Sequence, residues 1–211
     1  MTLTAGVVAV QGDVSEHADA VRRAGEACGR ETEVVEVRTA GTVPDCDALL
    51  MPGGESTTIS RLLWSEGIAE EIVDHVEAGK PVLATCAGLI VAAADAGDDR
   101  VRNLGAVDVT VERNAFGRQK DSFEAPLDVS GLDDPFPAVF IRAPVIADVG
   151  DDVEVLAEWD GRPVAVRDGP VVGTSFHPEL TPDARLHDLA LFEAMDGATH
   201  SEDREEPTPD R

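Results

Sequence analysis

The sequence predicts an α/β fold, a doubly wound and mostly parallel sheet with flanking helices and added short antiparallel strands. Up to about residue 94, continuous apolar runs alternate with helical patterns, and this alternation is typical of a parallel sheet covered by helices on both faces. After that point short β-type runs follow one another, and two of the turns between them are Asp160-Gly161 and Asp168-Gly169. Aspartate followed by glycine is typical of β-hairpins, so this part predicts antiparallel strands.

The first part of the chain contains the predicted parallel strands. Leu3 to Val10 is continuously apolar, as strands buried on both faces are. Asp13 and Glu16 resemble a capping box that starts the first helix. In chain order, the predicted elements are a strand over 3–10, a helix to about Ala27, strands over 32–37 and 48–51, one helix or two over 57–78, and a strand from Pro81 to the turn at Cys86.

The second part contains shorter predicted elements and ends in a polar segment. Strands are predicted at 107–111, 123–129, 138–141, 153–159, 163–166 and 171–175, and a last helix at 181–195. Residues 197–211 are acidic and have too few apolar side chains to form a core. We therefore expect one domain over residues 1–196 and a disordered acidic tail over residues 197–211.

The charge and hydropathy of the chain exclude two classes of partner. The net charge is −25, from 42 acidic and 17 basic side chains, and only Lys80 and Lys120 are lysines. No basic stripe exists to neutralise phosphates, so we expect no nucleic-acid partner. No apolar run approaches the roughly 20 residues that cross a bilayer, so we expect no membrane association. An acidic surface with few lysines indicates a halophile, in whose salty cytoplasm counterions screen the repulsion.

The cysteines and the N-terminus indicate a cytoplasmic location. Cys28, Cys46 and Cys86 are an odd and widely spaced set, which gives neither a disulfide framework nor a CxxC metal pair. The first residues lack the basic region of a signal peptide. A reducing compartment suits such a chain.

Cys86 is the candidate nucleophile. It lies between the apolar run Val82–Ala84 and the helix-forming run 87–94, at a sharp strand-to-helix turn like a nucleophile elbow. The turn exposes the thiol, and the N–H groups at the start of the next helix favour the thiolate. The alternative is that Cys86 is a small buried hydrophobic residue, as most free cysteines are.

His177 and Glu179 are the candidate partners of Cys86. They lie in His177-Pro178-Glu179, which follows an apolar strand, and ligands of parallel sheets bind beyond the carboxyl ends of the strands. A histidine beside a cysteine can act as its base, and a carboxylate can hold the imidazole in one tautomer. A lone His-Pro-Glu would more often be a surface turn. The remaining histidines stand in polar or helical contexts and are predicted to lie on solvated faces: His17, His75, His187 and His200.

Together these motifs closely resemble the PdxT family, the glutaminase subunits of pyridoxal 5′-phosphate synthase, within the class I glutamine amidotransferases of flavodoxin-like fold. The resemblance runs from about Gly6 to about Leu191. It rests on Thr85-Cys86-Ala87-Gly88 with His177-Pro178-Glu179, and on the stretches at 11–14, 52–58, 111–119, 121–124 and 140–144. One departure is Ala84, where the family commonly has glycine before the Thr-Cys pair.

The resemblance implies that the chain hydrolyses L-glutamine to L-glutamate and ammonia through a Cys-His-Glu triad and a glutamyl thioester. It implies that the backbone N–H groups of Gly54 and Ala87 form the oxyanion hole. It also implies a set of glutamine-binding residues: Gly53, Gly54, Glu55, Arg113, Ile141 and Arg142. An arginine can pair with an α-carboxylate through two parallel hydrogen bonds, which suits Arg113 and Arg142.

The resemblance also implies the partners. Ammonia passes to a (βα)₈-barrel synthase subunit, in a large hetero-oligomer, which builds pyridoxal 5′-phosphate. The chain needs no cofactor and shows no metal site, and it has neither a P-loop nor a GxGxxG motif. Two alternatives are a stand-alone thiol hydrolase or peptidase on the same fold and a non-catalytic regulatory subunit. The first leaves the 113–119 signature unexplained, and the intact triad argues against the second.

Overall fold

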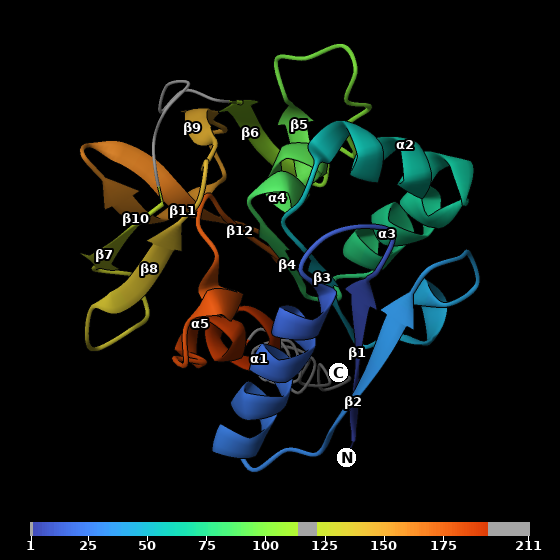
Figure 1. Cartoon of the computed structure of the whole chain (residues 1–211), viewed down its shortest axis with the longest axis horizontal. Helices are drawn as coiled ribbons and strands as arrows, with labels where there is room; N and C mark the ends of the chain where they lie inside the picture. The colour runs from blue at the N-terminus through green and yellow to red at the C-terminus, as the bar shows by residue number, and fades with distance from the viewer. Residues whose placement is uncertain (1, 114–121, 194–211) are drawn as a thin grey trace, which may run out of the picture.

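A seven-stranded sheet forms the centre of the molecule in the computed structural model, which describes residues 2–113 and 122–193 (Figure 1). The strand order is β10-β11-β12-β4-β3-β1-β2. Five strands are parallel, namely β1 (Leu3–Val8), β2 (Thr32–Val37), β3 (Ala48–Met51), β4 (Val82–Thr85) and β12 (Val171–Thr174). Two are antiparallel, namely β10 (Glu154–Trp159) and β11 (Arg162–Asp168). The predicted fold class is confirmed.

Helices cover both faces of this sheet, as the alternating pattern predicts. They are α1 (Val14–Ala27), α2 (Ser56–Ser65), α3 (Ile68–Glu77), α4 (Ala87–Ala92) and α5 (Arg185–His187), the last continued by a π-helical turn (Asp188–Phe192). Figure 1 shows α2 and α3 beside α4, and α1 beside α5. Of the two apolar clusters, one includes side chains of α2, α3 and α4, and the other includes side chains of α1 and of the α5 region.

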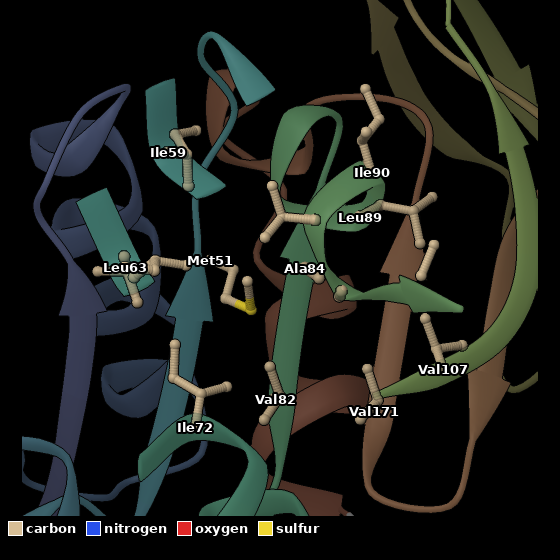
Figure 2. Close-up of a cluster of buried hydrophobic side chains, with 14 of the residues drawn as sticks. Met51, Ile59, Leu63, Ile72, Val82, Ala84, Leu89, Ile90, Val107 and Val171 are labelled. Atoms are coloured by element: carbon tan, nitrogen blue, oxygen red, sulfur yellow. The ribbon is translucent and has the colours of Figure 1, made fainter. Parts of the chain in front are cut away.

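Strand β4 separates these two clusters because its side chains alternate in direction. Val82 and Ala84 pack in the first cluster, and Leu83 packs in the second. Figure 2 shows Val82 and Ala84 in the first cluster, close to Met51 of β3. Ala84 is fully buried, so the methyl group that distinguishes it from glycine is accommodated in the core.

Two smaller sheets extend the molecule beyond the central sheet. One contains β5 (Ala93–Asp95), β6 (Val107–Glu112) and β9 (Val145–Val149), and the other pairs β7 (Phe123–Leu127) with β8 (Phe136–Phe140). The phenylalanine rings of Phe123 and Phe140 stack with their centroids 4.6 Å apart. Strands β5 and β9 were not predicted, because each is short and both are stabilised by pairing with β6 rather than by a pattern of their own.

The structure resolves one helical prediction and corrects another. The 57–78 region, where one helix or two were expected, forms two helices, because Gly67 adopts a left-handed conformation between them with φ of 73°. The last helix does not begin at Thr181: residues 178–180 form a 3₁₀ turn, and helical structure starts at Arg185. Pro182 accounts for the late start, since a proline disfavours helical angles in the residue before it. Gly79 follows α3 with φ of 74°, as expected of a residue that ends a helix.

Several predictions fall outside the described residues: the signature residues 114–119, Asp121, His200, the end of the last helix and the tail at 197–211. Within the described part of the chain, no helix is both long and apolar enough to cross a bilayer.

Candidate active site

One pocket of about 420 Å³ lies beyond the carboxyl ends of the parallel strands. Its walls come from the segments that follow β1, β3, β4 and β12, which are the turns where ligands of such sheets bind, and from the segments that follow β6 and β8. The lining residues are Gln11, Asp13, Gly54, Glu55, Ser56, Cys86, Ala87, Ile90, Arg113, Ile141, Arg142, Pro144, His177 and Leu180. The structure therefore brings Cys86 and His177 to one pocket from positions far apart in the sequence.

Cys86 lies at the sharp turn that the sequence predicts. It joins β4 to α4 with φ of 48° and ψ of −105°, a conformation that non-glycine residues seldom adopt. The Cys86 N–H donates to the carbonyl of Thr174 at 2.8 Å, which ties the turn to β12. Because a strained backbone persists only where the surrounding structure holds it, this turn is a device for presenting the thiol at the pocket.

His177 lies between Cys86 and Glu179. Its Nδ1 is 2.6 Å from Oε1 of Glu179, whose side chain is fully buried. Burial alone would lower the pKa of His177, but its hydrogen bonds to the Cys86 side chain and to Glu179 outweigh burial and raise that pKa to about 10. The raised pKa favours the protonated, imidazolium form of His177, which lies next to the Cys86 side chain.

Asp13 does not act as the predicted capping box. Its side chain makes no capping hydrogen bond to α1, and its Oδ2 lies 3.8 Å from Nδ1 of His177. The attraction of the charged ring explains why the carboxylate faces the pocket instead of the helix.

The side chains of Asp13, His177 and Glu179 together have the composition of a cation site. Asp13, His177 and Glu179 each offer one ligand atom, and these atoms lie within 4.8 Å of one another. However, Nδ1 of His177 is engaged with Glu179 and carries a proton in the imidazolium, whereas a metal ligand must be deprotonated. The geometry favours hydrogen bonding over metal binding here.

Five of the six residues expected to bind glutamine line the pocket: Gly54, Glu55, Arg113, Ile141 and Arg142. The sixth, Gly53, lies under the His177 ring, because a Cβ at Gly53 would stand 2.5 Å from Cε1 of His177. Ala87 and Gly54, the expected oxyanion donors, are both on the pocket wall.

Arg113 and Glu55 are paired in the structure. Nη2 of Arg113 lies 3.3 Å from Oε1 of Glu55, and its Nη1 donates to Oδ2 of Asp98. Glu55 also caps α2, since its Oε2 accepts the N–H of Thr58 at 2.8 Å. Hydrogen bonds, foremost that from Thr57, lower the pKa of Glu55 to about 2. This edge of the pocket therefore presents both a fixed positive and a fixed negative charge.

Sequence reasoning gave Gln11 no role. Its Oε1 accepts the N–H of Glu55 at 2.7 Å, so it joins the turn after β1 to the turn after β3. The adjacent Gly12 has φ of 116°, and a Cβ there would stand 1.9 Å from the carbonyl oxygen of Gly53. The stretch at 11–14 pointed to this turn, but not to the contact it makes.

The prediction that His17, His75 and His187 are solvated is wrong. Their exposed fractions are 0%, 4% and 0%. On α1, the buried positions His17, Ala20, Val21 and Ala24 share one face, and this spacing is the signal that could have revealed a buried histidine.

Comparisons with known proteins show which family this chain resembles in sequence and in structure. Residues 7–195 match the model of the SNO glutamine amidotransferase family. The pyridoxal 5′-phosphate synthase subunit PdxT of Haloarcula marismortui is 76% identical over 93% of this chain and 100% of its own length. The subunit of the same name from Halobacterium salinarum is 73% identical over 94% of this chain and 98% of its own length. A crystal structure of a glutamine amidotransferase superimposes with a TM-score of 0.81 at 46% identity, covering 90% of this chain and 98% of that one.

Proposed function

This chain belongs to the SNO glutamine amidotransferase family, the PdxT glutaminase subunits of pyridoxal 5′-phosphate synthase, and we propose that it hydrolyses L-glutamine through Cys86, His177 and Glu179. One observation carries the proposal: Cys86 and His177 line one pocket, with Glu179 Oε1 2.6 Å from His177 Nδ1. A nucleophile, a base and an orienting carboxylate in this order are what thiol-based acyl transfer requires.

The proposed reaction has two halves. The Cys86 thiolate attacks the side-chain amide carbon of glutamine, and His177, which holds the thiol proton, gives that proton to the departing ammonia. The resulting glutamyl thioester is then attacked by water, which His177 deprotonates, and glutamate leaves as the Cys86 thiol is restored. Glu179 keeps Nδ1 of His177 protonated, so that Nε2 faces the reaction.

The pocket supports a division of roles for the other residues. The N–H groups of Gly54 and Ala87 stabilise the oxyanion, and a donor of this kind typically contributes about 3–4 kcal/mol. Arg113 and Arg142 bind the α-carboxylate of glutamine, and Glu55 attracts its α-ammonium group. Gly53 and Ile141 complete the binding site.

Ammonia then passes to a (βα)₈-barrel synthase subunit within a hetero-oligomer, and we place the reaction in the cytoplasm. The relatives named pyridoxal 5′-phosphate synthase subunit PdxT support such a partner. Cys46 and Cys86 form no disulfide in the structure, which supports a reducing compartment.

Docking of the partner completes the oxyanion hole in this proposal. The Gly53 carbonyl lies against Gly12, and a trans peptide directs its N–H opposite to its carbonyl. The orientation of the Gly53–Gly54 peptide thus decides where the Gly54 N–H points. Without this donor the isolated chain should turn over glutamine roughly 10²–10³ times more slowly than the complex.

The test is ammonia release from glutamine by the purified chain, with and without a saturating synthase subunit. We expect partner-stimulated turnover that is abolished in Cys86→Ala and kept in Cys28→Ala, a matched control at an exposed cysteine. Equal rates with and without the partner would refute the docking step but not the triad. Ammonia release by Cys86→Ala would refute the thiol mechanism.

Ammonia release, together with ester or peptide cleavage and binding of the synthase subunit, separates the two alternatives. A stand-alone thiol hydrolase would ignore glutamine and cleave esters or peptides in a Cys86-dependent way. A non-catalytic subunit would release no ammonia under any condition, although it would still bind the synthase.

A further inference from the structure

A buried histidine stands directly behind the candidate triad. His17 of α1 has no exposed surface, and its Nε2 lies 3.1 Å from Oγ1 of Thr85 and 3.4 Å from Oε2 of Glu179. Thr85 and Glu179 are themselves buried. One ring nitrogen therefore faces two polar atoms, one from the end of β4 and one from the 3₁₀ turn that follows β12.

Each of these two atoms belongs to a residue that is adjacent to one of the candidate catalytic residues, His177 or Cys86. Glu179 uses its other oxygen, Oε1, to hold Nδ1 of His177. Thr85 is the last residue of β4, immediately before Cys86. The imidazole of His17 thus lies between the carboxylate that orients the base and the residue that carries the nucleophile.

The protonation state of His17 fits a donor at Nε2. Burial, followed by the nearby His187 and His177, lowers the pKa of His17 well below its ordinary value, so the ring is neutral and has one N–H. Ionised carboxylate oxygens only accept hydrogen bonds. In the described part of the chain, neither Nδ1 of His17 nor Oε2 of Glu179 has a hydrogen-bond partner, whereas Nε2 of His17 is hydrogen-bonded to Oγ1 of Thr85 and lies 3.4 Å from that Oε2. The N–H therefore belongs on Nε2, where it faces Oγ1 of Thr85 and the otherwise unpartnered Oε2 of Glu179.

We propose that His17 is a positioning residue for the glutaminase reaction: its Nε2–H holds the Glu179 carboxylate and Thr85 together and so fixes the distance between His177 and Cys86. This inference rests on the proposed function, because it assigns a support to the same triad. His17 touches neither the substrate nor the reacting atoms, and it acts through Glu179.

Three substitutions at His17 test the donor. His17→Gln keeps an amide N–H near the position of Nε2, His17→Asn can reach only the position of Nδ1, and His17→Leu removes the donor. His75→Leu is the matched control, since His75 is a buried helical histidine that contacts the Pro81 carbonyl at 3.4 Å and lies outside the pocket lining.

Two readouts respond to positioning but not to a general loss of stability. The first is kcat and KM for glutamine in the complex with the synthase subunit. The second is the pH profile of Cys86 alkylation by iodoacetamide, followed by mass spectrometry of the Cys86 peptide. Outer hydrogen-bond partners of metal-bound histidines typically contribute about 10–100-fold, and we expect a similar fall in kcat for His17→Leu and His17→Asn. KM should stay within about threefold, since His17 does not line the pocket.

The alkylation profile of these two variants should move to higher pH, because a poorly held Glu179 stabilises the His177 imidazolium less. His17→Gln should retain most of kcat and the wild-type profile, and His75→Leu should lower only the melting temperature. If His17→Leu fails to fold, the difference in kcat and in the alkylation profile between His17→Gln and His17→Asn still tests the proposal. Equal kcat in those two variants, or wild-type kcat and profile in His17→Asn, would overturn the proposal.

The proposed function and this inference can fail separately. If the wild-type complex releases no ammonia, the proposed function fails. The alkylation profile of Cys86 still shows whether His17 positions the Cys86–His177 pair.

Discussion

At the scale of single residues, Arg113 is notable because its guanidinium already forms ion pairs with carboxylates of the same chain. Its guanidinium pairs with Glu55 and with Asp98, and the Asp98 side chain is largely shielded from solvent, with an exposed fraction of 17%. Asp98 in turn binds Arg100, whose hydrogen bonds hold the pKa of Asp98 well below its usual range. Asp98 is thus a carboxylate at any physiological pH, and it anchors the arginine expected to bind glutamine.

Asp98→Ala should therefore weaken glutamine binding. Without its anchor, the Arg113 side chain must be ordered by the substrate itself, so we expect KM to rise by up to about tenfold, equivalent to about 1.4 kcal/mol, while kcat changes little. Asp99→Ala removes the same charge at an exposed neighbour and serves as the control. A KM that falls in Asp98→Ala would mean that Asp98 competes with the substrate for Arg113.

Gly12 offers a second test at this scale. A Cβ at residue 12 would stand 1.9 Å from the Gly53 carbonyl oxygen, so Gly12→Ala must displace the Gly53–Gly54 peptide. We expect a loss of roughly 10²–10³ in partner-stimulated turnover if the Gly54 N–H is an oxyanion donor. Gly41→Ala is matched, since Gly41 also has positive φ but no atom lies within 4 Å of the place that its added methyl group would take. Turnover that falls equally in both variants would point to backbone strain in general.

At the scale of elements, the helices bury histidines that the sequence alone did not reveal. Helical periodicity shows which positions share a face, but a polar side chain on that face is ordinarily assigned to solvent. His75 of α3 and His187 of α5 are both buried. Burial lowers the pKa of His75 to about 4, and burial followed by the charge of Arg23 lowers that of His187 to about 3.

These histidines should make the fold sensitive to acid. Each is neutral in the folded state but binds a proton in the unfolded state below about pH 6.5, so the stability they contribute is present above that pH and is lost as pH falls toward 4 and 3. For His75 the resulting loss in the free energy of unfolding is roughly 3 kcal/mol. Denaturant unfolding across pH 4–7, in concentrated KCl to screen the net charge, measures it. His75→Gln should weaken the dependence of the unfolding free energy on pH. An unchanged dependence would contradict the lowered pKa of His75.

At the scale of the whole molecule, the sequence predicted the architecture better than the details of the site. Apolar strands and turn glycines specify the parallel sheet locally, and the elbow at Cys86 and the motif at His177 follow strands whose register brings them together. The contacts of Gln11, Asp13 and His17 depend on how α1 and its preceding turn meet the other strands. Such contacts join residues distant in sequence, so no local pattern encodes them.

The net charge of −25 is the property of the whole molecule with the clearest consequence. Screening extends over about 10 Å at 0.1 M salt and about 3 Å at 1 M, so repulsion between acidic side chains opposes folding at low salt and fades at high salt. The similarity to proteins of Haloarcula marismortui and Halobacterium salinarum agrees with a salt-adapted chain. We expect the melting temperature to rise steadily from 0.1 to 2 M KCl.

A variant with fewer charges separates screening from other effects of salt. Asp74→Asn, Glu77→Gln, Asp151→Asn and Asp152→Asn change four exposed carboxylates, which reduces the net charge from −25 to −21. If screening dominates, this variant should melt higher than the wild type at 0.1 M KCl and approach it at 2 M, because the repulsion it relieves is already screened there. Parallel curves for the two proteins would assign the salt effect to exclusion of ions from the protein surface instead. A wild-type melting temperature that does not depend on salt would refute the link between the charge and stability.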